Sequence, residues 1–244
     1  MTAFFLSFIV AFAFAHDSSV GDEAFFRIDY PTAIAAYEHN VQSYPGDAEI
    51  FWRLARVYVC MGEVKDNDEA ETLFLKAEAY ARTCIRLDSS NAEGHTWLAA
   101  ALGYSALNAG MKEQLRLTNE LQAEIDKALA LNPHNDAAYS IRGSLYRTLG
   151  NLGWLQRQLA TLLLGSVPPG GFEEAEVALK HAIAYAPDVM RHHYELGVLY
   201  LDWDRTDEAK KELEIAVTLP VRVAIDRPRL AKIKQLLASL NNPR

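Results

Sequence analysis

The sequence predicts an all-α fold of repeated helical hairpins, on the evidence of its composition and of four recurring turns. Among the 244 residues, 36 Ala and 31 Leu make up 27% of the chain, against 13 Gly and 9 Pro. Ala and Leu are strong helix formers. Similar turns recur at residues 44–49, 87–93, 131–137 and 185–189, each between two Ala-rich amphipathic segments. Pro or Ser just past a helix stops it and Asp or Asn can cap the next, so each turn joins two helices.

The segments on either side of the turns repeat two spacings of small and large residues. Those after the turns follow aromatic-x2-Leu-small-x2-aromatic, with substitutions. The copies are Phe51-Leu54-Ala55-Tyr58, His95-Leu98-Ala99-Leu102, Tyr139-Arg142-Gly143-Tyr146 and His193-Leu196-Gly197-Tyr200. Those before the turns follow small-x3-large-x2-small-x4-Pro, most clearly at Ala33-Tyr37-Asn40-Pro45 and Ala175-Leu179-Ala182-Pro187. Small residues let the two helices of a hairpin approach closely, and large ones fill the gap to the next hairpin.

At these residues the chain resembles the tetratricopeptide repeat family. The resemblance implies a right-handed superhelical solenoid of about five hairpins. The Pro or Ser markers at 45, 89, 133 and 187 are 44, 44 and 54 residues apart, against about 34 in the plain repeat. We therefore expect insertions near 63–72, 106–118 and 152–172, the last forming a further packed helix around Trp154. A short first helix at 23–28 and a capping helix at 227–240 complete the expected architecture.

The pattern of insertions narrows the resemblance to the regulator-of-microtubule-dynamics family and its bacterial relatives. Residues 92–104, 154–175 and 193–203 carry this likeness. Members of that family are tetratricopeptide adaptors, and the animal members associate with microtubules or organelle contact sites. A vaguer resemblance is to periplasmic lipoproteins of the same repeat type that assist substrate-binding transporters, although no Cys near residue 16 is present for lipidation.

The first fifteen residues read as a secretory signal peptide. They hold five of the ten Phe and are almost wholly apolar from residue 3. Thirteen helical residues span roughly 20 Å, which is too short for a bilayer. Ala13 and Ala15 supply an A-x-A cleavage site. We expect cleavage to leave a repeat domain at 16–244 that is periplasmic or secreted, the alternatives being an uncleaved anchor and a cytoplasmic segment.

Charge and motifs favour a non-enzymatic adaptor that binds a protein or peptide. The net charge of -8 argues against a general nucleic-acid binder, which needs a basic surface. No phosphate-binding loop, dinucleotide fingerprint, H-E-x-x-H or G-x-S-x-G motif occurs in the sequence, and no cofactor is implied. The alternative is a periplasmic carrier or transporter-accessory protein that binds a small ligand or metal in a pocket beside the Trp154 insertion. An open groove would favour the adaptor, and a deep closed pocket the carrier.

The first helices of the hairpins should line a concave groove in which the partner binds. Side chains one residue after each leading aromatic, and one or two turns further on, point into it. The candidate groove residues are Trp52, Arg56, Thr96, Ser140, Ser144, Arg147 and Tyr194. Trp, Tyr and Arg are enriched at binding hot spots. Arg56 and Arg147 would be local positive charges, so we expect a peptide with acidic or aromatic groups. Alternatively, Trp52 packs within the solenoid.

Three other groups of residues offer weaker chemical signals. His181, His192 and His193 flank one turn and could form a transition-metal site, the alternative being that His193 packs and His192 is solvated. Cys60 and Cys84 fall at opposite ends of one hairpin, so we expect two unpaired, buried thiols. Asp66, Asp68, Glu69 and Glu71 should form an acidic loop, which lacks the central Gly of a calcium loop and which we expect to be a solvated polar insertion.

Overall fold

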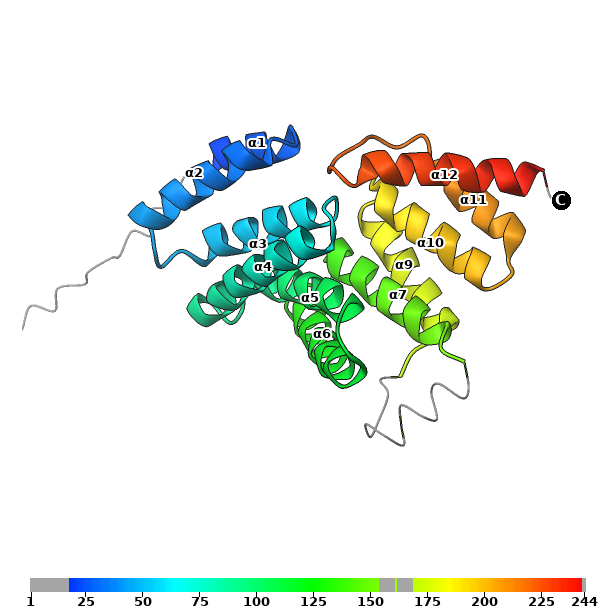
Figure 1. The fold of residues 1–244 in the computed structure, drawn as a ribbon, viewed down its shortest axis with the longest axis horizontal. Helices are drawn as coiled ribbons and strands as arrows, with labels where there is room; N and C mark the ends of the chain where they lie inside the picture. Colours follow the sequence, from blue (N-terminus) through cyan, green and yellow to red (C-terminus); the bar gives the residue numbers. More distant parts are fainter. Residues whose placement is uncertain (1–17, 154–160, 162–168, 243–244) are drawn as a thin grey trace, which may run out of the picture.

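The computed structural model describes residues 18–153, 161 and 169–242, and within these ranges all regular secondary structure is helical (Figure 1). Eleven helices have both of their ends within the described residues. They are α1 (Ser19–Phe26), α2 (Tyr30–Ser43), α3 (Ala48–Gly62), α4 (Asn67–Leu87), α5 (Ala92–Leu107), α6 (Met111–Leu131), α7 (Asp136–Gly150), α9 (Phe172–Tyr185), α10 (Met190–Asp202), α11 (Thr206–Ala216) and α12 (Asp226–Asn241). In the described part of the chain, no helix is long and apolar enough to cross a membrane.

The helices pack as five consecutive hairpins followed by a cap. The hairpins are α1–α2, α3–α4, α5–α6, α7–α9 and α10–α11, and α12 packs against the last of them. This confirms the predicted all-α stack of about five hairpins. The short first helix and the capping helix are both present, with bounds shifted by up to four residues from the expected ones.

The recurring turns are helix caps. Asp47, Asn91 and Asn135 each precede the first helix of a hairpin. Their side-chain oxygens accept hydrogen bonds of 2.9 Å from backbone N–H groups two or three residues ahead. These bonds satisfy donors that the first turn of a helix otherwise leaves unpaired. Side-chain chemistry local to the turn therefore fixes where these three helices begin.

The small residues of the repeat are sites of close helix contact. A Cβ atom at Gly143 would overlap the side chain of Leu179, and one at Gly197 would lie 2.9 Å from the side chain of Leu213. Both leucines are fully buried. These two glycines let the helices of a hairpin approach closely, as predicted. The large residue opposite each of them fills space within the same hairpin and not, as expected, the gap to the next one.

The first two insertions lengthen helices. α4 and α6 each have 21 residues, against 14 in α2. The acidic residues of this segment are exposed to solvent, as expected. The expectation that they form a loop is wrong, because Asp68 and Glu69 form the first turn of α4. Carboxylates are stabilised there by the positive end of the helix dipole. The third insertion, with the helix expected around Trp154, lies largely outside the described residues.

Two histidines at the leading aromatic position show where the extra residues were accommodated. His95 Nδ1 lies 2.5 Å from the Glu124 carboxylate, and His193 Nδ1 lies 2.7 Å from that of Glu212. The other ring nitrogen of each histidine faces a carbonyl oxygen of the preceding turn. The pairs are 29 and 19 residues apart along the chain. The difference of ten residues matches the expected insertion, which leaves the contact itself intact.

The two ends of the hairpin stack meet. We call residues 217–225, between α11 and α12, the closing segment. The backbone N–H of Ala224 donates a 2.9 Å hydrogen bond to the Tyr30 hydroxyl, 194 residues away in sequence. Val223 and Ala224 also pack against the buried cluster of the first hairpins. Figure 1 shows the end of α1 near the start of α12, at the same edge of the molecule. The closing segment thus covers part of the concave face.

Candidate functional site

The concave face contains a chamber of about 370 Å³, within the usual size range of small-ligand pockets. The first helix of every hairpin contributes to it, together with the closing segment and α12. Its lining includes Phe25, Phe26, Arg56, Cys60, Glu63, Glu93, Trp97, Ala100, Asn135, Asp136, Ser140, Ile141, Val189, Arg191, His192, Arg222, Val223, Asp226 and Arg229. Phe26 is 69% exposed, so the chamber reaches solvent beside α1.

Arg56 forms one wall of the chamber and is held by α1. Its guanidinium lies 3.3 Å from the Asp22 carboxylate and 3.8 Å from the centre of the Phe25 ring. Burial opposes ionisation of Asp22, but hydrogen bonds from Tyr37 and the charges of Arg53 and Arg56 outweigh it and hold the pKa of Asp22 below its usual value. The positive charge of Arg56 is therefore compensated within the chain.

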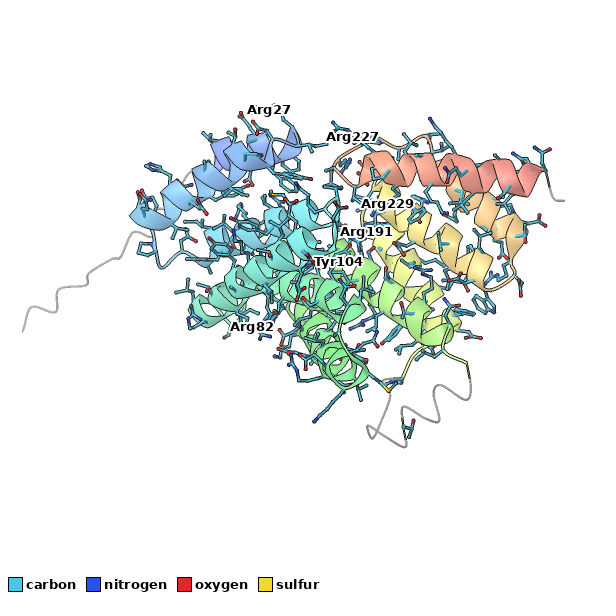
Figure 2. The ribbon with its side chains drawn as sticks, viewed as in Figure 1. Arg27, Arg82, Tyr104, Arg191, Arg227 and Arg229 are labelled. Carbon is cyan, nitrogen blue, oxygen red and sulfur yellow. The ribbon has the colours of Figure 1, made fainter. Side chains whose placement is uncertain are left out.

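Arg191 lies at the inner end of the chamber, where Figure 2 shows it between Tyr104 and Arg229. Its guanidinium is 3.3 Å from the Glu63 carboxylate, whose side chain is almost completely buried. The Tyr104 hydroxyl donates a short hydrogen bond to the same carboxylate. Ala100, Ile141 and Arg191 also line a second cavity of about 270 Å³, so this group separates two hollows of the concave face.

Arg229, on α12, pairs with a carboxylate that also shapes the closing segment. Asp226 forms an ion pair with Arg229 and accepts hydrogen bonds of 2.9 and 3.1 Å from the backbone N–H groups of Arg222 and Val223. A single buried carboxylate in the first turn of α12 therefore orients the closing segment and compensates the guanidinium.

Two carboxylates in the chamber have no such counter-ion. Glu93 accepts hydrogen bonds from Trp97 Nε1 at 3.0 Å and from Asn135 Nδ2 at 2.9 Å. Burial raises the pKa of Glu93 above its usual value. Asp136 is 2.9 Å from His192 Nε2. Within residues 18–153, 161 and 169–242, neither carboxylate forms an ion pair with a lysine or arginine.

His192 and Ser140 present buried polar atoms to the chamber. Burial lowers the pKa of His192, which favours a neutral ring near neutral pH. Because the Asp136 carboxylate can only accept, the ring hydrogen belongs on Nε2 and Nδ1 is an acceptor. Nδ1 of His192 and Oγ of Ser140 have no hydrogen-bond partner among the described residues, and their residues are 2% and 1% exposed.

Asparagine side chains at the turns join successive hairpins. Asn91 Nδ2 donates to Glu49 at 2.7 Å, and Asn135 Nδ2 donates to Glu93 at 2.9 Å, each across 42 residues of sequence. The sequence reasoning missed these residues. The signal that could have found them is the recurrence of Asp/Asn-Ala-Glu at 47–49 and 91–93, which places a carboxylate in the first turn of each helix.

The predicted groove residues do not all line one groove, and four of the seven line two different cavities. Arg56 and Ser140 line the chamber, and Ser144 and Arg147 line the second cavity. Arg147 is paired with Asp202 at 2.9 Å and Glu195 at 3.6 Å. Neither predicted local positive charge is therefore uncompensated.

The other three predicted groove residues pack elsewhere. Trp52 lies against a buried cluster formed by Ala48, Phe51 and Cys84, and its Nε1 donates to Glu49 at 2.9 Å. Thr96 is fully buried, and its hydroxyl accepts a hydrogen bond from Asn135. Tyr194 packs in the C-terminal cluster, 5.6 Å from the Arg229 guanidinium. None of the three lines the chamber.

The structure does not bring the three histidines together as a metal site. His181 stacks on Tyr139 and Tyr185 with ring centres 4.9 and 6.1 Å away. His192 and His193 bind separate carboxylates. In the part of the chain that the structure describes, no group of three or more His, Cys, Asp or Glu is placed to hold a metal. The expectation that His192 is solvated is wrong, because α10 turns its ring into the chamber.

The two cysteines are buried and unpaired, as predicted. Burial raises the pKa of both thiols, that of Cys84 to about 12. Such thiols stay protonated near neutral pH and behave as small apolar side chains.

Known proteins are similar to this chain in fold and in sequence. A thermophilic tetratricopeptide repeat protein of Thermus thermophilus superimposes with a TM-score of 0.65 at 21% identity, covering 91% of this chain and 95% of that one. The fold is thus that of tetratricopeptide repeat proteins.

Curated relatives carry the likeness at the level of sequence. Regulator of microtubule dynamics protein 2 of Bos taurus is 23% identical over 219 residues, which cover 88% of this chain and 53% of the relative. Regulator of microtubule dynamics protein 1 of Caenorhabditis elegans is 25% identical over 189 residues, covering 78% and 84%. The chain therefore spans about half the length of the bovine relative. The family model "Regulator of microtubule dynamics protein 1-3" matches residues 22–241, and the chain belongs to this family.

Proposed function

We propose that this protein is a non-enzymatic interaction module that holds a segment of a partner protein in the chamber. The observation that carries the proposal is the lining itself. The first helices of all five hairpins, which form the concave binding face in stacked repeats, converge on one hollow with buried polar atoms that have no partner among the described residues. A partner segment entering past the exposed Phe26 would meet these groups.

A small-ligand carrier is the second candidate, because the closing segment covers part of the concave face and leaves a partly open hollow. About 370 Å³ admits a small organic molecule or a few side chains, but not a folded domain. If the protein is an adaptor, its chamber can hold only a narrow, extended peptide segment. If the protein is a carrier, the chamber holds a free small molecule that fits the same volume.

Photo-crosslinking separates the two candidates. A benzoylphenylalanine in place of Phe26 at the chamber mouth should give a covalent adduct of protein mass in extracts of the native cell. The same residue at Ile215, 43% exposed on α11, serves as the matched control. Adducts from both positions, or from neither, would contradict the adaptor. Native mass spectrometry showing a bound small molecule in place of a protein adduct would establish the carrier.

We also propose that the protein is exported, with residues 1–15 as the signal and 16–244 as the working domain. The apolar run ending at Ala13 and Ala15 supports this proposal. N-terminal sequencing of the protein from its native cell should then begin at His16. The names of the relatives connect those proteins with microtubule dynamics, and an intact Met1 in a cytoplasmic fraction would favour a role of that kind here.

A further inference from the structure

We infer that the chamber binds a cationic amine, with its ammonium group between Glu93 and Asp136 and its N–H groups donated to His192 Nδ1 and Ser140 Oγ. The inference rests on the proposed function, because it names the chemistry of the group that the chamber receives. That chemistry is shared by a lysine side chain of a partner and by a free amine.

The first argument for a cationic ligand comes from the charges in the chamber. Arg56, Arg191 and Arg229 each have a carboxylate of the chain within ion-pair distance. Arg222, also in the lining, is paired with Asp188. Glu93 and Asp136 are hydrogen-bonded to neutral donors and form no ion pair with a lysine or arginine of the described ranges, although the charge of Arg56 acts on Glu93. The charge that lacks an ion-pair partner in this chamber is therefore negative. This reverses the acidic ligand expected from the arginines.

The second argument comes from the buried polar atoms that have no hydrogen-bond partner among the described residues. A buried acceptor without a donor costs free energy, about 1–3 kcal/mol for a typical neutral group. His192 Nδ1 can accept a hydrogen bond, and Ser140 Oγ can accept one as well. A ligand that satisfies His192 Nδ1 must bring an N–H or O–H group, whereas the Ser140 hydroxyl can accept or donate. The Nε atoms of Arg56 and Arg191 are buried donors without a described partner in the same lining, but each of these guanidiniums is already paired with a carboxylate through another nitrogen. Anionic groups such as carboxylates or phosphates bring acceptors and cannot satisfy Nδ1.

The local geometry joins these four groups. Asp136 and Ser140 are four residues apart on α7 and so lie on one face of the helix, one turn apart. The hydrogen bond between His192 and Asp136 ties α10 to this face. Asn135, next to Asp136, ties Glu93 of α5 to the same place. Three successive first helices thus present two carboxylates, an imidazole nitrogen and a hydroxyl to one hollow.

An ammonium group fits this set better than a metal ion does. It carries three N–H donors, which can serve three of these four acceptors at one time. The same side chains are not assembled at metal-binding distances from one another, since no such group is found in the described ranges. The aromatic rings of Phe25 and Trp97 also line the chamber and offer apolar surface to the methylene stem of the amine.

Calorimetric titration of the full-length protein tests the inference. The probes are acetyl-Ala-Lys-Ala-amide, its norleucine and glutamate counterparts, and 1,4-diaminobutane. We expect the lysine peptide to bind and the other two peptides not to bind. Binding of diaminobutane without the lysine peptide would identify a free amine as the source. Equal binding of the norleucine or glutamate peptide, or no binding of either amine, would overturn the inference.

Isosteric variants locate the site. Glu93→Gln and Asp136→Asn should each weaken amine binding about tenfold or more, since hydrogen bonds to charged groups are the stronger ones. Ser140→Ala removes no bond described for its side chain and should weaken binding a few-fold in a protein that folds normally. Asp207→Asn, the same change of charge on an exposed residue of α11, is the control and should leave binding unaltered. Unchanged affinity in the first three variants would refute the site.

The crosslinking experiment keeps this inference apart from the proposed function. If a crosslinker at position 26 captures a protein but neither amine binds, the proposed interaction module is supported and the inferred amine ligand is refuted. If an amine binds and no protein is captured, the chamber chemistry stands and the adaptor is wrong.

Discussion

The fit of Gly197 to Leu213 makes a quantitative prediction about how two helices of a hairpin recognise each other. Leu213 is fully buried on α11, and a Cβ at Gly197 would lie 2.9 Å from its side chain. Leu213→Ala should lower the free energy of unfolding by about 3 kcal/mol, through lost burial and the cavity left behind.

The effect of Gly197→Ala should change sign with the residue at position 213. Alanine favours a helix over glycine by about 1 kcal/mol, but overpacking costs about 1–3 kcal/mol. In the native protein the substitution should therefore destabilise, by about 1 kcal/mol. With Leu213→Ala present, the overlap is gone and the same substitution should stabilise by about 1 kcal/mol. The coupling between the two sites is thus about 2 kcal/mol, within the range for residues in contact.

Urea unfolding of the two single variants and the double variant, followed by circular dichroism, measures this coupling. Ile215→Ala, which removes an aliphatic side chain that is 43% exposed on the same helix, is the control and should cost less than about 1 kcal/mol. An equal effect of Gly197→Ala in both backgrounds would refute the packing argument, as would a stabilised single variant.

Three further outcomes are expected. The hydrogen bond to Glu124 raises the pKa of His95 above its usual value. The stability that Glu124 lends should therefore be complete below about pH 6.5 and fall as the pH rises through the folded-state pKa. Urea unfolding of wild type and Glu124→Gln between pH 5 and 8 should show the difference shrinking, and a constant difference would contradict this. Tyr30→Phe should cost about 1 kcal/mol and speed hydrogen exchange at Ala224, whereas unchanged exchange would show that the ends are held by other contacts. Asp22→Asn weakens the hold on two arginines of α3, so exchange across α1 should rise while that of α12 stays as in wild type.

Much of the fold follows from the sequence because its determinants are local. Helix caps such as Asn91 act within three residues, and the small and large positions recur at helical spacing. The conformation of the acidic run near Asp68 was predicted wrongly, because an exposed polar insertion can equally be a loop or the first turn of a longer helix. Local pattern does not separate those two cases.

The candidate site was less predictable because its character depends on distant partners. Periodicity placed Arg56 and Arg147 on the concave face, where both line a cavity. It could not show that Asp22, 34 residues away, and Asp202, 55 residues away, would neutralise them. The charge that remains in the chamber is set by which carboxylates the fold leaves without a cation. That property becomes visible only when all five hairpins are in place.

The contact between Tyr30 and Ala224 has a consequence for how this architecture can change over time. An open solenoid can gain or lose a repeat and keep working, because each repeat touches only its neighbours. Here one extra hairpin would carry the closing segment past the first hairpin and abolish the bond between them. The contact between the two ends therefore restricts the number of hairpins in the stack. New residues are accommodated within existing helices, as in α4 and α6. Growth by lengthening rather than by duplication is the route open to a stack whose ends must meet.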